Sequence, residues 1–569
     1  MLLGLALTLG LLVGQRPGDP QLQPPDELRG PGAYTEALIG APRALNPLLD
    51  SLNPVDRDLD RLIFSGLTRF DNFGRPIPDL AADWSISADQ RTYTFLLKPA
   101  VQWHDGTPLT AADVAFTVKL LQDPAYPGPE DLKTLWQSVT VALTGTQTIA
   151  FTLSEPFAPF LDYTAIGILP KHLLAGTNAA QLPQAPFNVQ PVGSGPYQFD
   201  RWLAAGDHVT GVSLQVFPGY SDQPVDQNNN PTKWNLTQLT FKFYADVPAA
   251  LEALRKGDVL GVSHIDREQS PQALQIPDLN FYTTLEPEYS LIFLNQRDEA
   301  LSFFKEKKVR QALLLGLNRS AMVTDILRGQ AVVANSPVIP GSWAYHLALP
   351  TVNYDPEAAR VLLESAGWTF AEGALPGTDT YVRQKKGAPL KFTLTVPDTP
   401  VHLAVARAAQ ATWAALGVQA EISPQDPAAI RSQFLEPRAF QAVLVDLSLA
   451  GTPDPDPYPL WHETQAESGQ NYSGFSDRIS SQYLEQARIT TDIVARARLY
   501  QSFQARFADQ APALLLYYPV YNYAIKADIG GVQVGALTEP SDRFNTVVDW
   551  YLVKRSAAQP LVSESTPAP

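Results

Sequence analysis

The sequence predicts a mixed α/β protein of two or three domains, for two reasons. Its 569 residues are far more than one compact core usually holds. Strand and helix patterns also alternate in the C-terminal half, where an apolar strand at 390–396 precedes a helix at 401–416 and Gly417 leads into another strand. Such alternation is typical of an α/β lobe.

The stretch 79–118 predicts a strand, a tight turn and a helix in succession. Residues 92–97 are mostly β-branched or aromatic, which favours a strand, and Asp105-Gly106 suits a turn. Thr110 and Asp113 have the spacing of a capping box, so a helix should begin at Ala111.

The identities of the residues in this stretch are more specific than its secondary-structure pattern. It contains Trp84, then Tyr93-Thr94-Phe95, then Trp103-His104-Asp105-Gly106-Thr107-Pro108 and Ala112-Asp113-Val114. These residues closely resemble the signature of the extracytoplasmic solute-binding proteins of family 5, the peptide, dipeptide, opine and nickel receptors of ABC importers. The resemblance implies an α/β, two-lobed periplasmic-binding-protein-like fold (type II, cluster C-like) with an extra β-rich subdomain in the first lobe. It also implies a membrane permease and ATPase as partners, a monomer, and no cofactor.

The resemblance covers about residues 34–550 and gives the expected domain bounds. Lobe I comprises residues 33–66, 190–286 and 520–555, the extra subdomain 67–189, and lobe II 287–519. Residues 15–32 read as a linker, and 556–569 as a disordered tail.

The composition excludes several kinds of site and ligand. The absence of cysteine excludes disulfides, thiolate metal sites, cysteine nucleophiles and a lipid-bearing cysteine. The net charge of −16 argues against nucleic acid and favours cationic or neutral ligands. The apolar segment 1–14 has the length of the hydrophobic part of a signal peptide, although no Lys or Arg precedes it. A misassigned start codon would explain the missing positive charge. The alternative to a signal peptide is that segment 1–14 forms a buried helix. We expect an extracytoplasmic protein.

The sequence contains no H-E-x-x-H, phosphate loop, dinucleotide fingerprint or G-x-S-x-G motif. Gly193-Ser194-Gly195 has the wrong spacing for a nucleophile elbow and resembles a turn of the family. The interpretation is a receptor that is not an enzyme and holds no metal. The alternative is a secreted hydrolase using Asp454 with Glu463, since glycosidases work with two acids.

The predicted ligand-facing loop follows an apolar strand at 441–445. Alternating Asp and Pro at 453–457 cannot continue a strand or helix, so we expect a rigid, exposed turn with solvated carboxylates. By resemblance, Leu449, Ala450, Gly451 and Thr452 contact the solute. Gly451 stands where peptide receptors of the family often carry the aspartate that holds the peptide's amino terminus. We therefore expect this loop to recognise a peptide or peptide-like solute through backbone and shape; an opine, sugar or metal chelate is the alternative.

Four further residues complete the predicted site. Leu45 and Asn46 resemble an early N-P element of the family. Tyr289 lies in an extended run at 285–295, taken as the first crossing between lobes, and Tyr521 lies in the returning strand at 513–523; core packing is the alternative for both. Helices are also expected at 60–70 and, as a pair, at 305–329.

Overall fold

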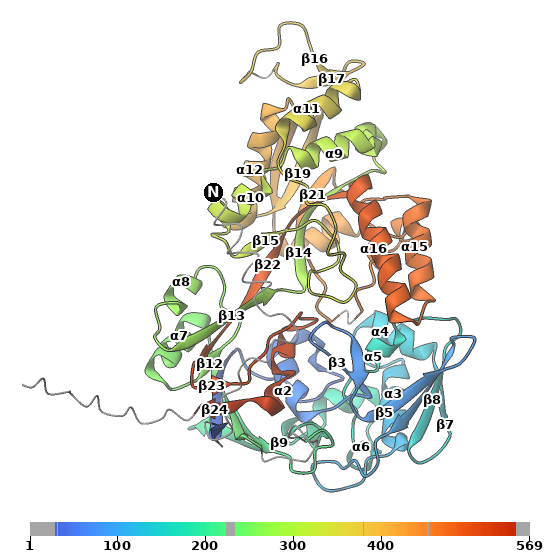
Figure 1. The fold of residues 1–569 in the computed structure, drawn as a ribbon, viewed down its shortest axis with the longest axis vertical. Coiled ribbons are helices and arrows are strands. Elements are labelled where there is room, and N and C mark those ends of the chain that lie inside the picture. Colours follow the sequence, from blue (N-terminus) through green and yellow to red (C-terminus); the bar gives the residue numbers. More distant parts are fainter. Residues whose placement is uncertain (1–28, 31, 224–233, 379, 452–453, 554–569) are drawn as a thin grey trace, which may run out of the picture.

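The computed structural model describes residues 29–30, 32–223, 234–378, 380–451 and 454–553. The predicted leader 1–14, most of the linker 15–32 and the tail 556–569 lie outside them. A twelve-stranded mixed sheet runs through the molecule in the order β20-β19-β21-β14-β22-β12-β2-β11-β10-β9, with β13 and β15 also paired to β22 (Figure 1). Its strands are β2 (Gly32–Ile39), β9 (Tyr197–Ala205), β10 (His208–Val216), β11 (Leu236–Tyr244), β12 (Gly261–Val262), β13 (Leu279–Leu285), β14 (Glu288–Leu294), β15 (Ala331–Val333), β19 (Lys391–Pro397), β20 (Gln419–Gln425), β21 (Ala442–Ser448) and β22 (Ala513–Lys526).

Strand β22 joins the two lobes. Its first half pairs with β14, where Leu514 stands opposite Ile292, and its second half pairs with β13, where Tyr521 stands opposite Thr284. Because β13 and β14 are separated only by Glu286 and Pro287, the chain passes between the lobes twice at one place. We call this place, residues 285–288 and 517–521, the crossing. The names lobe I, extra subdomain and lobe II keep their proposed ranges.

The extra subdomain contains a four-stranded antiparallel sheet in the order β5-β6-β8-β7. The strand predicted at 92–97 is confirmed as β6. The helix predicted from Ala111 is α3, and both halves of its capping box form: the Thr110 N–H donates to Asp113 Oδ2 at 2.9 Å. The bounds here are β5 (Ala81–Ile86), β6 (Thr92–Leu97), β7 (Thr140–Leu143), β8 (Thr148–Thr152), α3 (Ala111–Gln122), α4 (Glu130–Gln137), α5 (Phe160–Tyr163) and α6 (Lys171–Leu174).

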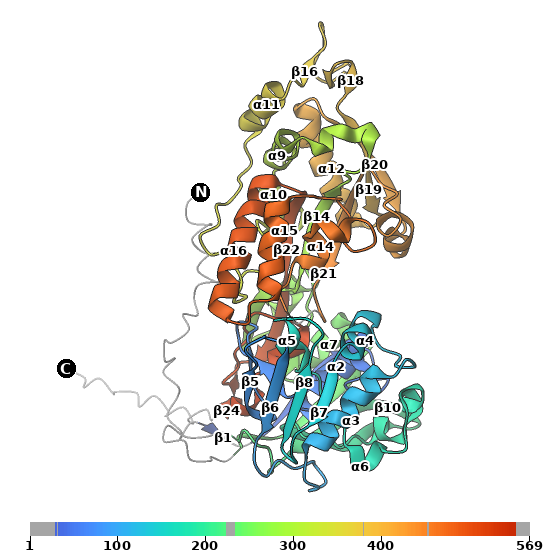
Figure 2. The same cartoon turned by 90° about the vertical axis from the view of Figure 1, so that its right-hand side faces the viewer.

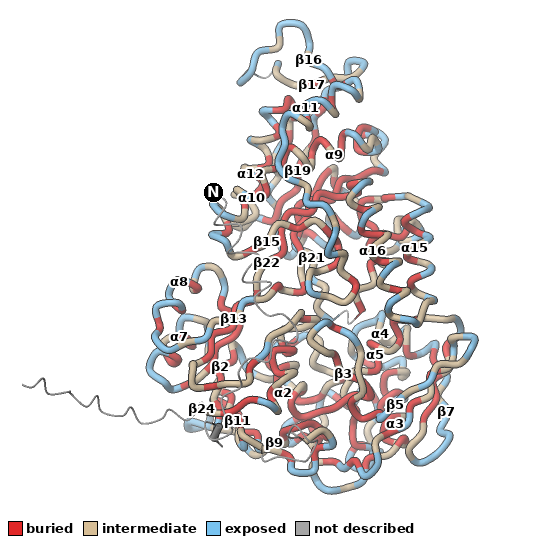
Figure 3. The backbone as a smooth tube through the Cα atoms, viewed as in Figure 1, coloured by how far each residue is buried: buried red, intermediate tan, exposed pale blue. Residues whose placement is uncertain are grey.

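The sheet of lobe II is covered on both faces. Alternate residues of β14 point to opposite sides: Ile292 packs with α9 and α12, whereas Phe293 packs with α14 and α16. Figure 3 shows the resulting buried interior between exposed outer surfaces. The helices are α9 (Lys307–Leu315), α10 (Arg319–Ala321), α11 (Pro356–Ser365), α12 (Pro400–Ala415), α13 (Pro427–Ala429), α14 (Tyr458–Trp461), α15 (Arg478–Arg488) and α16 (Ile493–Gln510).

Two helix predictions are wrong in their bounds. The helix expected at 60–70 is α2 (Pro54–Ile63), and Thr68–Phe70 is strand β3. The cap explains the shift, because Asn53 Oδ1 accepts the Val55 N–H at 3.0 Å and Pro54 fixes the first turn. In the pair expected at 305–329, the second helix is only α10 followed by a π-helical turn at Met322–Ile326.

The remaining elements are short, apart from α7 of lobe I. They are β1 (Arg29–Gly30), β4 (Pro76–Pro78), β16 (Thr369–Phe370), β17 (Arg383–Lys385), β18 (Ala388–Pro389), β23 (Ile529–Gly530), β24 (Tyr551–Val553), α7 (Val247–Lys256) and α8 (Ser270–Ala273). Within the described part of the chain, no helix has the length and apolar character needed to cross a membrane.

Candidate functional site

The loop after β21 is tied directly to the crossing. Strands β21 and β14 pair antiparallel, with Ser448 opposite Glu288. One residue further, the Leu449 N–H donates to the Pro287 carbonyl at 2.7 Å. The predicted ligand-facing loop and the passage between lobes therefore form one site.

A pocket of about 70 Å³ lies beside this loop and is lined from both lobes. Phe73 of the extra subdomain and Leu537 of lobe I contribute apolar side chains, as does Leu449 of lobe II. The residues that line it are Phe73, Gly74, Pro287, Pro337, Val338, Ile339, Ser342, Leu449, Asp454, Pro455, Asp456, Pro457, Leu460, Ala536, Leu537 and Thr538. A mostly apolar pocket with a few polar groups is the usual lining of a small-molecule site.

The expectation of an exposed Asp-Pro turn with solvated carboxylates is wrong. Asp454 is only 2% exposed and forms a bidentate pair with Arg496 of α16 at 2.5 and 2.7 Å. Asp456 pairs with Arg488 of α15 at 2.6 Å. The arginines lie more than thirty residues away in sequence, so no local pattern reveals them, and they compensate for the burial of each carboxylate.

The ion pairs of Asp454 and Glu463 test the alternative of a carboxylate-dependent hydrolase. Glu463 pairs with Arg478 at 3.0 Å, so Asp454 and Glu463 belong to two separate ion pairs. Among the described residues, no three or more His, Asp or Glu side chains are arranged to hold a metal ion.

The loop residues Leu449, Ala450 and Gly451 lie together at the crossing. The Ala450 N–H donates to Ser448 Oγ at 3.2 Å. Gly451 has φ +77°, and an added Cβ would have nothing within 4 Å. The backbone conformation, rather than crowding, therefore favours glycine at this position. Thr452 lies outside the described residues.

The other predicted site residues are buried. Leu45 and Asn46 lie inside lobe I, where Asn46 Nδ2 donates to Asn188 Oδ1 at 3.1 Å. Tyr289 packs in the core of lobe II. Tyr521 is fully buried at the crossing, edge-on to His264 with ring centroids 5.2 Å apart.

Sequence reasoning missed two acids at the crossing. Glu286 and Glu288 flank Pro287, are partly buried, and form no ion pair or side-chain hydrogen bond with any described residue. Burial, followed by the neighbouring charge of Glu288, raises the pKa of Glu286 to about 7. Burial, followed by the charge of Asp446, raises the pKa of Glu288 to about 7. The available signal was a pair of acids within an otherwise apolar run.

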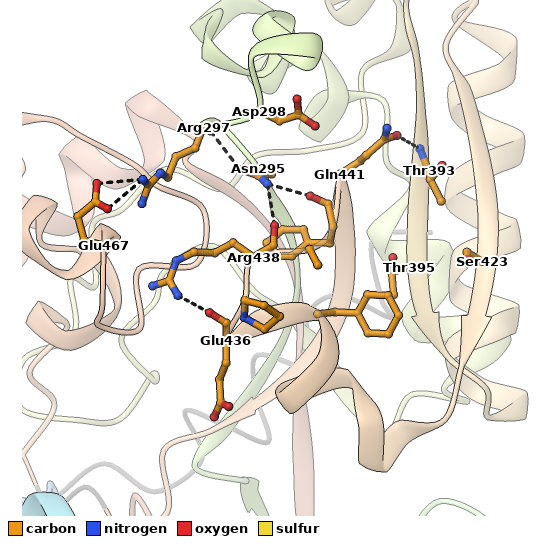
Figure 4. Close-up of a pocket in the computed structure, with 14 residues that line it drawn as sticks. Asn295, Arg297, Asp298, Thr393, Thr395, Ser423, Glu436, Arg438, Gln441 and Glu467 are labelled. Atoms are coloured by element: carbon orange, nitrogen blue, oxygen red, sulfur yellow. Dashed lines mark hydrogen bonds and ion pairs between the residues drawn. The ribbon is translucent and has the colours of Figure 1, made fainter.

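A larger pocket, about 750 Å³, lies elsewhere in lobe II (Figure 4). Its charged groups already have partners: Arg297 pairs with Glu467 at 2.9 Å, and the Arg438 guanidinium donates to the backbone carbonyls of Glu436, Ala466 and Gly469. All lining residues belong to lobe II. The crossing, which both lobes line, is the better candidate site.

Comparisons with known proteins agree with this architecture. The sequence model of the bacterial extracellular solute-binding proteins, family 5 Middle, matches residues 75–470. The oligopeptide-binding protein AppA of Bacillus subtilis (strain 168) is 28% identical over 532 residues, covering 92% of each chain. The dipeptide-binding protein of Escherichia coli (strain K12) is 25% identical over 530 residues, 88% of this chain and 91% of that one.

Solved structures give the same result. AppA from Bacillus subtilis in complex with a nonapeptide has a TM-score of 0.63 at 26% identity, covering 92% of this chain and 99% of that one. NikZ from Campylobacter jejuni in complex with Ni(L-His) has a TM-score of 0.65 at 25% identity, covering 91% and 99%. The two-lobed fold expected from the signature is confirmed. Because the family model matches more than half of the chain, the protein belongs to the bacterial extracellular solute-binding proteins of family 5.

Proposed function

We propose that the protein is the solute-binding receptor of an ABC importer and captures a peptide or peptide-like solute between its lobes. The observation that carries this proposal is the pocket at the crossing, which lobe I, the extra subdomain and lobe II line together. Its relatives support the solute class, since they are named oligopeptide- and dipeptide-binding proteins. The receptor would act outside the cytoplasm, as a monomer, and pass its solute to a permease and ATPase.

The crossing provides a physical basis for capture. Two strands connect the lobes at one place, so a small change in their backbone angles swings one lobe against the other. The pocket beside Leu449 would hold an apolar side chain. The Leu449 and Ala450 N–H groups already donate to the Pro287 carbonyl and to Ser448 Oγ, so other backbone groups of the loop after Ser448 would bind the peptide main chain.

The test is to identify and then titrate the solute. Native mass spectrometry of the protein purified without denaturation should show one small molecule per chain. Calorimetry with that molecule, on protein unfolded and refolded to remove it, should then give binding at a one-to-one ratio. We expect the solute to be a peptide and to be recovered unchanged.

Three results would overturn the proposal. The first is a non-peptide solute such as an opine, sugar or metal chelate, which would contradict the peptide assignment but not the receptor function. The second is chemical conversion of the solute, which would indicate an enzyme. The third is recovery of the protein only from the cytosol when the source cells are fractionated.

A further inference from the structure

Two glutamates at the crossing form no ion pair with any residue in the described part of the chain. We propose that Glu286 and Glu288 bind an ammonium group of the solute, either its amino terminus or a lysine side chain. This inference rests on the proposed function and names the charge that the receptor recognises.

The first argument is position. Glu286 and Glu288 flank Pro287, whose carbonyl accepts the Leu449 N–H at 2.7 Å. Gly451 is two residues beyond Leu449 on the same loop. The two carboxylates that flank Pro287 therefore lie beside the loop that contains Leu449 and Gly451.

The second argument is the charge balance around the two glutamates. Asp446, the neighbouring acid on β21, is occupied by His402, with Oδ2 and Nε2 2.8 Å apart. The pKa of Glu288 is raised by burial and by the charge of Asp446, and the smaller effect of the His402 charge lowers it. Within the described chain, no cation pairs with Glu286 or Glu288. Burial raises the pKa of each to about 7, as expected for partly desolvated carboxylates whose neighbours are also acidic.

The third argument is an unused hydroxyl on the same side of the strand. Tyr521 is fully buried and its hydroxyl oxygen has no hydrogen-bond partner in the described structure. Tyr521 stands opposite Thr284 in the β13–β22 ladder, so Glu286 is its diagonal neighbour on the same face, within reach of long side chains. Burial is the largest influence on the pKa of Tyr521 and raises it; Arg543 lowers it, and the charges of Asp58, Glu36 and, last, Glu286 raise it.

These groups match the chemistry of an ammonium ion. An ammonium carries three N–H donors and no acceptor. Two glutamate carboxylates and the Tyr521 hydroxyl oxygen offer three acceptors, and the paired negative charge makes the hydrogen bonds charge-assisted. The solute would supply a cation, since no described residue forms an ion pair with these glutamates.

The experiment compares matched peptides on matched variants by calorimetry. Each peptide is used with a free amino terminus, with an acetylated terminus, and with an acetylated terminus plus one lysine. The variants are Glu286→Gln, Glu288→Gln, the double variant, and Glu372→Gln as an exposed control in lobe II. Wild type and Glu372→Gln should prefer an ammonium-bearing form by roughly tenfold or more, the value of one hydrogen bond to a charged group.

The double variant should lose that preference while keeping its affinity for the acetylated peptide, which also shows that it is folded. Preference for the free terminus identifies the terminal amine, and preference for the lysine peptide identifies the side chain. Equal binding of all forms by wild type, or a preserved preference in the double variant, overturns the inference and leaves the receptor function intact. If no peptide binds, the proposed solute class fails. The chemistry of the copurified solute then tests this inference, and a solute without an ammonium group overturns it.

Discussion

At the scale of single residues, arginines buried far from their partners in sequence hold the fold together. Arg543 is fully buried and bonds both Glu36 of β2 and Asp58 of α2, at 2.7 and 2.6 Å. The hydroxyls of Tyr34 and Tyr523 donate to the other Glu36 oxygen at 2.6 and 2.8 Å. This network ties the segment after β22 to the first strand of lobe I.

Replacing Arg543 by methionine should lower the free energy of unfolding by about 3–5 kcal/mol, the usual cost of leaving buried charges uncompensated. Urea denaturation followed by tryptophan fluorescence measures the change. Arg255→Met, which removes the exposed pair with Glu252 on α7, is the matched control and should leave the midpoint unchanged. Equal midpoints for the two variants would show that the buried network does not stabilise the fold.

The second residue prediction concerns pH. Asp60 of α2 is 3% exposed and forms no ion pair with a described residue. Burial, followed by the charges of Asp50 and Asp56, raises its pKa well above the ordinary value. The folded protein thus favours the neutral acid, so the stability it contributes is present below the ordinary pKa of about 4 and is lost as the pH rises through the raised pKa.

Asp60→Asn keeps the shape and removes the titration. Its melting temperature should therefore exceed that of wild type by a margin that grows between pH 4 and pH 8. Differential scanning fluorimetry across this pH range measures the difference in melting temperature. A constant difference at every pH would indicate that Asp60 does not titrate with folding.

At the scale of elements, the turn Gly193-Ser194-Gly195 shows how close approach selects glycine. The Gly195 N–H donates to the Ile63 carbonyl at the end of α2, and the Gly193 carbonyl accepts the His104 N–H, both at 2.9 Å. A Cβ at Gly193 would stand 1.8 Å from the Ile63 oxygen. Ser194 is 2% exposed, which fits a structural turn.

Gly193→Ala should therefore destabilise the protein by about 1–3 kcal/mol, the usual cost of overpacking. Gly176→Ala is the control, because an added Cβ there meets nothing within 4 Å. Thermal denaturation compares the two variants. If Gly193→Ala and Gly176→Ala have the same melting temperature, the turn is able to move away from α2, and close approach does not explain the glycine at position 193.

The same scale shows what the sequence could predict. Elements with local signals were predicted well: the capping box of Thr110 begins α3, and the run of β-branched and aromatic residues at 92–97 forms β6. Features that depend on distant partners were not. The pairing of Asp454 with Arg496 forms only when α16 packs on the Asp-Pro turn, and the charge of Asp446 acts on Glu288 only because β21 pairs with β14. Of the predicted site residues, Tyr521 lies in the crossing, and Leu449, Ala450 and Gly451 lie on the loop beside it. Contact of these residues with the solute stays a prediction.

At the scale of the whole molecule, the contacts between the lobes define how they can move. One is the crossing. Another joins the extra subdomain to lobe II, where the Ala158 N–H donates to the Arg488 carbonyl at 2.6 Å and Gln90 Oε1 accepts from Thr491 Oγ1 at 3.2 Å. A third lies beside the pocket, where the Trp343 N–H of lobe II donates to the Phe73 carbonyl of the extra subdomain at 3.0 Å. Figure 1 shows α16 and α15 to the right of β22, and Figure 2 shows α15 and α16 above α5.

We take the line through the crossing and the Ala158–Arg488 contact as the axis for closure, because residues on an axis move least. Small-angle scattering should then show a smaller radius of gyration when a confirmed solute saturates the protein. Because the chain has no cysteine, Ala158→Cys with Arg488→Cys introduces the only thiols, at backbones already within hydrogen-bond distance. If the contact lies on the axis, the oxidised double variant should still contract on binding, as the reduced form does. Contraction that appears only after reduction would show that this contact must open, and the axis would have to be placed elsewhere. An unchanged radius in the wild type at saturation would contradict closure itself.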